Sequence, residues 1–203
     1  MSAGYKSKIK IAAIILAAGS SSRLGQSKQL LKIGKESLLR KVVLTTSAAG
    51  IDKIVVVLGA GHEKHQQEIA DLPALIAFNP NWEKGIGSSL KCGIRFVMET
   101  FPDIDLAVLL VCDQPMLTSE HIKKLISTYH SKESAIVSSY YSGSPGVPVL
   151  LQRSMFAKLL DVGDGQGAKG IVKDHPASVS FVEFPEGEVD LDTPEDLKKI
   201  TES

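Results

Sequence analysis

Short apolar runs alternate with amphipathic stretches along most of the 203-residue chain. This alternation is typical of βαβ units that build a largely parallel sheet with helices on its faces. We therefore predict strands at residues 9–16, 53–58, 75–78, 106–111, 134–139, 147–151 and 179–184. We predict helices at residues 36–48, 63–70, 88–99, 119–129, 155–160, 168–174 and 195–201. Because a chain of this length builds one substantial core, we expect a single domain over residues 9–203 after a flexible segment, residues 1–8.

The composition excludes several classes of partner. Lysine plus arginine and aspartate plus glutamate each total 23, so the chain lacks the broad basic surface that nucleic-acid binding needs. No apolar run approaches the roughly 20 residues of a membrane span. The two cysteines, Cys92 and Cys112, lie in predicted apolar elements, which fits core residues in a reducing compartment. We expect a cytoplasmic protein that binds neither nucleic acid nor a membrane.

The start of the chain imitates a secretory signal, because Lys6, Lys8 and Lys10 precede the apolar residues 11–18. This apolar part has only eight residues, which is near the lower limit for such a signal. Cleavage there would remove the first predicted strand. We therefore interpret the run as a strand of the sheet.

A loop of small residues follows this strand, with the sequence Leu16-Ala-Ala-Gly-Ser-Ser-Ser-Arg-Leu-Gly-Gln-Ser-Lys28. Backbone N–H groups of such a loop can surround phosphate oxygens, and Arg23 and Lys28 add positive charge beside them. The spacing matches neither G-x-G-x-x-G nor G-x-x-x-x-G-K-[ST]. A glycine turn after a strand also has a purely steric explanation, and the two cations have one as solvated surface bases. On these residues alone, a triphosphate cradle and a plain turn both stay open.

Five segments together resemble the MobA-like nucleotidyltransferases, in the same order along the chain. The first is the pattern A-A-G-x3-R-x-G-x2-K in the loop just described. The others are N-P-N-W-E-K-G-I-G-S-S from Asn79, C-D-Q-P from Cys112, G-S-P-G-V-P from Gly143 and D-L-D-T-P-E-D from Asp190. The resemblance runs from about residue 9 to residue 200. It implies an α/β fold, a Rossmann-like three-layer sandwich of the nucleotide-diphospho-sugar transferase type with a mostly parallel central sheet.

The resemblance also implies a Mg²⁺-dependent transfer of a nucleotide to a phosphorylated small molecule, with release of pyrophosphate. It implies catalytic roles for Arg23, Lys28 and Asp113, and it implies that Asp113 and Asp192 are ligands of the metal ion. The nucleotide is expected to lie against a larger set of residues, namely Leu16, Ala17, Ala18, Gly19, Ser20, Ser22, Arg23, Lys28, Gly59, Asn79, Gly85 and Ser89.

Asp113 follows a nearly continuous apolar strand, so its carboxylate should emerge at the carboxyl edge of the sheet. Ligands bind at this edge in open α/β folds, and we expect Gly19 and Gly59 to meet Asp113 there. A carboxylate in this place suits Mg²⁺, which takes one or two protein carboxylates plus phosphate oxygens of the substrate. The alternative is a turn-forming aspartate. Asp192 is either a second metal ligand or a neighbour that caps the last predicted helix.

Two further segments have both a structural and a functional interpretation. Ser88 and Ser89 are interpreted as an N-cap pair for the helix predicted there, and the resemblance places Asn79 and residues 85–89 along the nucleotide or acceptor pocket. Both interpretations can hold at once. Residues 163–169 resemble a family element, Gly-Asp-x-Gly-Ala-Arg, with one extra residue and with Lys169 in place of the arginine. This element implies an acceptor-phosphate site, and a flexible turn is the alternative.

Within the family, the chain is most similar to the branch that attaches CMP to molybdopterin, because Ala17-Ala18 rather than Gly-Gly resembles the CTP-using proteins. That branch implies CTP, a molybdopterin acceptor, and a molybdoenzyme or its maturation chaperone as a protein partner. Its members commonly have Gly-His-Pro where this chain has Gly146-Val147-Pro148. Two alternatives stay open. One is the use of GTP or another nucleotide with a different acceptor, such as a sugar phosphate, and the other is nucleotide or cofactor binding without turnover.

The histidines do not form a catalytic pattern. His62 and His65 are three apart rather than the four of H-E-x-x-H, so we interpret them as a solvated helix start. His121, His130 and His175 have no evident constellation. A phosphomonoester acceptor has a second pKa of about 6, so most of it is already a dianion at neutral pH and needs no general base. Transfer to it needs charge screening, positioning and stabilisation of the leaving pyrophosphate instead.

Overall fold

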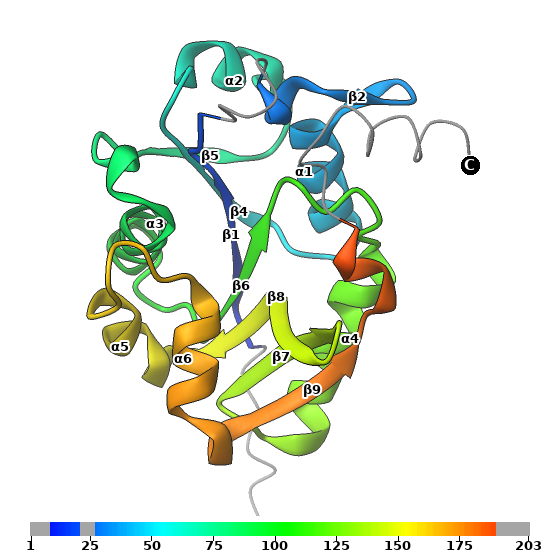
Figure 1. Ribbon diagram of the computed structural model, residues 1–203, viewed down its shortest axis with the longest axis vertical. Helices are drawn as coiled ribbons and strands as arrows, with labels where there is room; N and C mark the ends of the chain where they lie inside the picture. The colour runs from blue at the N-terminus through cyan, green and yellow to red at the C-terminus, as the bar shows by residue number, and fades with distance from the viewer. Residues whose placement is uncertain (1–8, 21–26, 190–203) are drawn as a thin grey trace, which may run out of the picture.

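The structure, a computed structural model, describes residues 9–20 and 27–189. Its centre is a seven-stranded sheet with the strand order β5-β4-β1-β6-β8-β7-β9 (Figure 1). In this described sheet, β8 runs antiparallel to β6 and β7, and the other pairs are parallel. The strands are β1 (Ile11–Ala17), β4 (Lys53–Leu58), β5 (Leu75–Phe78), β6 (Leu106–Val111), β7 (Ile136–Tyr141), β8 (Ser144–Gln152) and β9 (Val179–Glu183).

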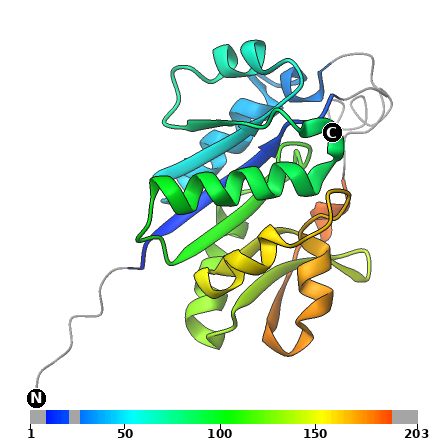
Figure 2. The same cartoon turned by 90° about the vertical axis from the view of Figure 1, so that its left-hand side faces the viewer.

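Helices cover both faces of the sheet, which gives three layers (Figure 2). One face carries α3 (Ile86–Thr100), α5 (Phe156–Leu160) and α6 (Ala168–Asp174), and the other carries α1 (Leu38–Ala48) and α4 (Ser119–Lys132). The helix α2 (His62–Glu68) packs against α1 and β4. Short 3-10 helices are η2 (Lys28–Leu30), η3 (Trp82–Lys84), η4 (Arg153–Met155), η5 (Pro176–Ser178) and η6 (Pro185–Glu188). The predicted three-layer α/β fold is confirmed.

The core has two halves because neighbouring residues of a strand point to opposite faces of the sheet. Along β6, Leu106, Val108 and Leu110 belong to the half that contains α1 and α4. Ala107 and Leu109 belong to the half that contains α3, α5 and α6. All five side chains are buried. A strand buried on both faces is apolar at every position, and for this reason the runs of the sequence are continuous rather than alternating.

The predicted helix at residues 36–48 is wrong in its first two residues. Glu36–Ser37 form a short strand, β3, which pairs antiparallel with β2 (Lys32–Ile33). The turn between them contains Gly34 at φ +66°, a conformation that glycine adopts without steric cost. The side chain of Ser37 then accepts a hydrogen bond from the backbone N–H of Arg40 at 3.2 Å and caps α1.

The other predicted elements in the described residues are present, and those at 53–58, 75–78, 106–111 and 168–174 have the predicted ends, whereas the rest have shifted ends. The strand predicted at 147–151 extends to Ser144–Gln152, because it forms a hairpin with β7 through Ser142 and Gly143, both at positive φ. The helix predicted at 195–201 lies outside the described residues. No helix in the described ranges has the length and apolar character to cross a membrane.

Candidate active site

A cavity of about 370 Å³ opens at the carboxyl ends of β1 and β6. Because these two strands are adjacent and parallel, the loops that follow them meet at the same edge of the sheet. Nine of the sequence-predicted site residues lie around this one cavity: Leu16, Ala17, Ala18, Gly19, Ser20, Lys28, Gly85, Ser89 and Asp113. The remaining described lining residues are Gln29, Trp82, Glu83, Ile86, Val111 and Cys112, of which only Ile86 lies in a segment, residues 85–89, that the resemblance places along the pocket.

The loop after β1 is held from behind by Gln29, a residue of η2 that is only 3% exposed. Its side-chain amide donates to the backbone oxygen of Ala17 at 3.1 Å and to that of Gly19 at 2.8 Å. Among the described residues, the amides of Gly19 and Ser20 have no hydrogen-bond acceptor. The loop therefore has its carbonyls bound and offers N–H groups beside the cavity, as an anion cradle requires.

Lys28 and Asp113 form an ion pair across the cavity, with 3.2 Å between Nζ and Oδ2. The residues are 85 positions apart in the chain, and the parallel strands bring them together. The lysine side chain is 13% exposed and the aspartate side chain 32%, so the carboxylate remains reachable from the cavity. Cys112, which directly precedes Asp113 in the chain, is buried. Burial raises the pKa of its thiol, with a further rise from the Asp113 charge, so this thiol is no nucleophile at neutral pH.

Gly59 and Asn79, which were both predicted to face the nucleotide, are not among the described residues that line this cavity. A side chain at Gly59 would collide with Trp82 and with the backbone oxygen of Ala18, at 2.6 Å and 2.7 Å from the added carbon. Glycine at this position therefore lets the indole of Trp82 pack close to the loop after β1.

Asn79 is 3% exposed and orders the segment that starts α3. Its Nδ2 donates to the hydroxyls of Ser88 and Ser89 at 2.9 Å and 3.0 Å. The predicted N-cap pair is wrong, because Gly85 is the N-cap and α3 begins at Ile86. The hydroxyl of Ser88 instead donates to the backbone oxygens of Asn81 and Gly85, both at 2.8 Å.

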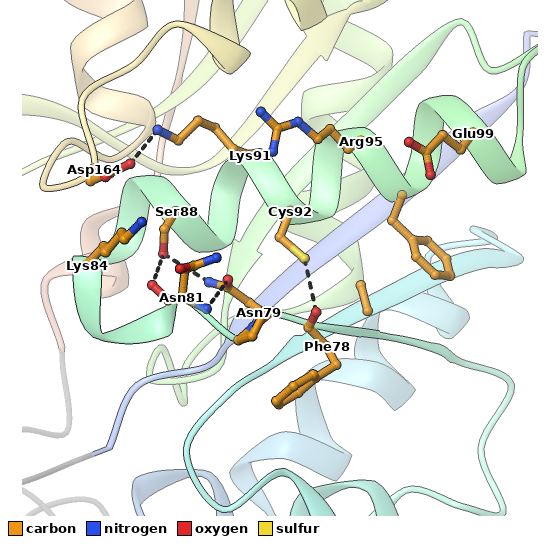
Figure 3. A pocket seen from close by; sticks show the side chains of 13 residues that line it. Phe78, Asn79, Asn81, Lys84, Ser88, Lys91, Cys92, Arg95, Glu99 and Asp164 are labelled. Carbon is orange, nitrogen blue, oxygen red and sulfur yellow. Dashed lines mark hydrogen bonds and ion pairs between the residues drawn. The ribbon is translucent and has the colours of Figure 1, made fainter.

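The segment 163–169 docks onto the start of α3 by its backbone. The N–H of Gly87 donates to the backbone oxygen of Asp164 at 2.7 Å. A side chain at Gly87 would stand 2.1 Å from the backbone oxygen of Gly163, so only glycine permits this contact. The ammonium of Lys91 also forms an ion pair with the Asp164 carboxylate, which lowers the pKa of that carboxyl (Figure 3). The segment 163–169 thus packs against the first turns of α3, and its predicted role in acceptor binding stays a prediction.

A second, polar groove of about 470 Å³ lies on the outer side of Asn79 and Ser88, between β5 and α3 (Figure 3). Lys84, Lys91 and Arg95 line it together with Phe78 and Asp164. It is larger than the cavity at the ends of β1 and β6. It lacks the loop after β1 and the strand-end carboxylate, so the smaller cavity is the candidate active site.

Gln114 ties the loop after β6 to the other half of the sheet. Its Nε2 donates to the backbone oxygens of Val147 and Gly187, both at 3.1 Å, and lies 3.2 Å from the hydroxyl of Tyr141. Val147, the residue in place of the family histidine, thus lies next to the strand end that carries Asp113.

Three of the predicted site residues, Ser22, Arg23 and Asp192, lie outside the described residues. The roles of Ser22 in nucleotide binding, of Arg23 in nucleotide binding and catalysis, and of Asp192 as a metal ligand stay predictions. Within residues 9–20 and 27–189, no three His, Cys, Asp or Glu side chains group closely enough to hold a metal ion by themselves.

The interpretation of His62 and His65 as a solvated helix start is wrong for His65, which is 2% exposed. Its Nε2 lies 2.6 Å from the hydroxyl of Ser27, directly before η2. His121 also has a constellation that the sequence did not reveal. It is buried, it stacks on Phe184, and its Nε2 lies 2.8 Å from the hydroxyl of Ser139.

Comparison with known protein families identifies the class of this protein as the nucleotidyltransferases, enzymes that use a nucleoside triphosphate. Residues 13–179 match the MobA-like NTP transferase domain, and the chain belongs to this family. Among solved structures, it superposes with a TM-score of 0.80 on a nucleotidyl transferase from Methanothermobacter, at 18% identity, over 95% of this chain and 96% of the other. It superposes with a TM-score of 0.72 on Rv0371C of Mycobacterium tuberculosis in complex with manganese, at 22% identity, over 96% and 99% of the two chains.

Relatives with different names match the chain about equally well. The purine catabolism protein PucB of Bacillus subtilis is 28% identical over 198 residues, which cover 92% of this chain and 94% of PucB. The molybdenum cofactor cytidylyltransferase of Escherichia coli is 26% identical over 189 residues, which cover 91% of this chain and 92% of the relative. Both similarities extend over nearly whole chains.

Proposed function

We propose that this protein transfers CMP from CTP to the phosphate of a molybdopterin-type acceptor and releases pyrophosphate. The observation that carries the proposal is the meeting of three parts in one cavity: the N–H groups of the loop after β1, the Lys28 ammonium and the Asp113 carboxylate. A loop of this kind binds phosphates, and a cation beside a carboxylate serves a reaction between two polyanions.

The residues fit a divalent cation, for which the proposal favours Mg²⁺. Asp113 offers a hard oxygen ligand that is partly exposed to the cavity, and such a cation usually takes its other ligands from substrate phosphates and water. When bound, the cation would neutralise phosphate charge. Asp113 would hold it, with Asp192 as the proposed second carboxylate.

The chain's own residues would supply the rest. The amides of Gly19 and Ser20 would bind triphosphate oxygens, and Lys28 would compensate the charge that develops as pyrophosphate leaves, with Arg23 as the proposed second cation. An acceptor phosphate oxygen would form the new bond to the α-phosphorus while the bond from that phosphorus to the pyrophosphate oxygen breaks. The acceptor is already a dianion, so no side chain needs to remove a proton.

The choice of CTP and of the pterin rests on the resemblance of Ala17-Ala18 and on the similarity to the cytidylyltransferase of Escherichia coli. The equal similarity to PucB and the valine at position 147 are the reasons to test the acceptor directly.

The test is to incubate the purified protein with CTP, GTP, UTP or ATP, with a molybdopterin acceptor or a sugar 1-phosphate, and with or without Mg²⁺ or Mn²⁺. The measured quantity is pyrophosphate. We expect release only when CTP, the pterin and a divalent cation are all present. Release with another nucleotide or with the sugar phosphate would replace the proposed substrates. Thermal stabilisation by a nucleotide, without pyrophosphate from any combination, would show a binding protein without turnover.

A further inference from the structure

A chain of hydrogen bonds connects α2 to the loop after β1 through buried or half-buried side chains. His65 Nε2 lies 2.6 Å from Ser27 Oγ, and Ser27 Oγ donates to Gln29 Oε1 at 2.8 Å. Gln29 Nε2 then donates to the backbone oxygens of Ala17 and Gly19. This chain, here called the His65 relay, ties together the two ends of the segment that includes the candidate phosphate cradle.

The proton positions in the relay follow from its last members. Because a backbone oxygen can only accept, Gln29 turns its NH₂ group toward Ala17 and Gly19 and its Oε1 toward Ser27. Ser27 therefore donates its one hydroxyl proton to Gln29, and its oxygen must accept a hydrogen bond from His65. Thus His65 carries a proton on Nε2.

The second ring nitrogen decides the charge of His65. Its Nδ1 is buried and has no hydrogen-bond partner among the described residues. A proton there would be an unsatisfied buried donor on a cation, which costs more than an unsatisfied acceptor. Burial lowers the pKa of His65, and the nearby His62 lowers it further. The imidazole is therefore neutral at pH 7, as the Nε2–H tautomer.

We propose that His65 is a positioning residue for the nucleoside triphosphate: through Ser27 and Gln29 it fixes the orientation of the loop that would hold the phosphates. This inference rests on the proposed function and extends it to a residue outside the cavity lining. Lys28 lies between Ser27 and Gln29, so the relay also fixes the turn that aims the ammonium at Asp113.

The structure offers a matched control for this role. His121 Nε2 lies 2.8 Å from Ser139 Oγ, which donates to the backbone oxygen of Pro148 at 2.8 Å. This chain also begins with a buried histidine and a serine, but it ends directly on a backbone carbonyl and lies between α4, β7 and β8. A loss of stability from breaking such a chain should be common to both histidines. A loss of nucleotide positioning should belong to His65 alone.

The experiment compares His65→Leu, His65→Gln and His121→Leu by steady-state kinetics at a temperature well below every melting point. Leucine removes the donor, while the glutamine amide keeps one near the position of Nε2. We expect His65→Leu to raise the KM for the nucleotide about tenfold, the effect of one hydrogen bond of about 1.4 kcal/mol, with kcat changed less than about twofold. His65→Gln should stay within about threefold of wild type, and His121→Leu should leave this KM unchanged.

Three results would overturn the inference: an unchanged nucleotide KM in His65→Leu, an equal rise in His121→Leu, or no rescue by His65→Gln at matched stability. If His65→Leu does not fold, Ser27→Ala interrupts the relay at its middle and should give the same rise in KM.

The inference and the proposed function fail in different ways. Pyrophosphate release by the wild-type protein is measured first, with the panel of nucleotides and acceptors. If nothing is released but CTP with Mg²⁺ still binds, the proposed reaction is wrong, and the same variants are compared by the dissociation constant of that complex. If no nucleotide binds the wild-type protein at all, both are wrong.

Discussion

Asp113→Asn is the substitution that most directly tests the candidate active site. Asparagine keeps the size and shape of the side chain and removes the negative charge that would hold a divalent cation. If Asp113 is a metal ligand, kcat for pyrophosphate release should fall at least about 10³-fold, or about 4 kcal/mol of transition-state stabilisation. The same loss should appear in the wild-type protein when a chelator removes the cation.

The cost in stability should be small by comparison. The Lys28–Asp113 pair is partly buried, with side-chain exposures of 13% and 32%, so it lies between a surface pair and a buried one. We expect a loss of about 1 kcal/mol, which lowers the melting temperature of a chain of this size by about 2–4 °C. The variant therefore stays folded at assay temperature, and its loss of activity reports on chemistry.

The assay measures pyrophosphate release at saturating nucleotide, with the melting temperature of each variant determined in parallel. Asp103→Asn is the control, because this carboxylate also pairs with a lysine, Lys10, before β6 begins and thus at the opposite edge of the sheet. It should keep wild-type turnover. A folded Asp113→Asn variant that works within tenfold of wild type would refute the metal assignment.

Two further predictions concern stability. Gly93→Ala in α3 should destabilise the protein by roughly 1–3 kcal/mol in urea unfolding, because the added carbon would stand 2.5 Å from Ile14 Cγ2. Gly170→Ala in α6, where the nearest atom is 3.9 Å away, should instead be stabilising by about 0.5–1 kcal/mol, and equal effects would contradict the packing argument. Burial, with a smaller effect of Lys124 that Glu186 opposes, lowers the pKa of His121 from 6.5 to about 4. Between these values the unfolded state binds a proton that the folded state does not, so stability should fall by roughly 3 kcal/mol from pH 6.5 to pH 4. His121→Gln should flatten that part of the pH profile, and an unchanged slope would contradict it.

The fold could be predicted because its determinants are local in the sequence. Residues 54–58 and 106–111 are short, apolar at every position and separated by amphipathic stretches, a pattern that leaves few alternatives to buried parallel strands. The short strand at Glu36–Ser37 escaped prediction because its pairing with Lys32–Ile33 depends on a glycine turn and on the cap of the next helix. The hydrophobic pattern records neither.

The candidate site could be predicted only where residues follow strands. Ligands of open α/β folds bind at the carboxyl ends of parallel strands, and on this basis Gly19 and Asp113 were expected to lie together. Both line the same cavity. Gln29 and His65 escaped because a glutamine after a lysine, or a histidine in a polar helix, looks solvated in the sequence. Their burial depends on how α2 and η2 pack behind the loop after β1. Contacts of this kind are made in three dimensions and leave no periodic signal.

The direction of β8 divides the candidate site into two halves. Strands β5, β4, β1 and β6 are parallel, so the segments that would bind the nucleotide reach the site edge on one side of Asp113. On the other side β8 runs in reverse, with Leu109 of β6 opposite Val149, so the start of β8 rather than its end lies at that edge. This start includes Val147, which accepts from Gln114 directly beside Asp113.

We therefore expect that residues in one half of the candidate site can be substituted without changing the packing of the other half. A change around residues 79–89 acts through Asn79 and α3 on the nucleotide side, and it leaves the packing of β7 and β8 intact. A change at Val147 or Tyr141 acts through Gln114 on the opposite side, where the acceptor must approach if the triphosphate lies against the loop after β1. Solved structures with different names superpose on this fold, and we expect differences in acceptor within the family to concentrate around the start of β8. We therefore predict that the identity of residue 147 is a better guide to the acceptor than the overall similarity of the chains.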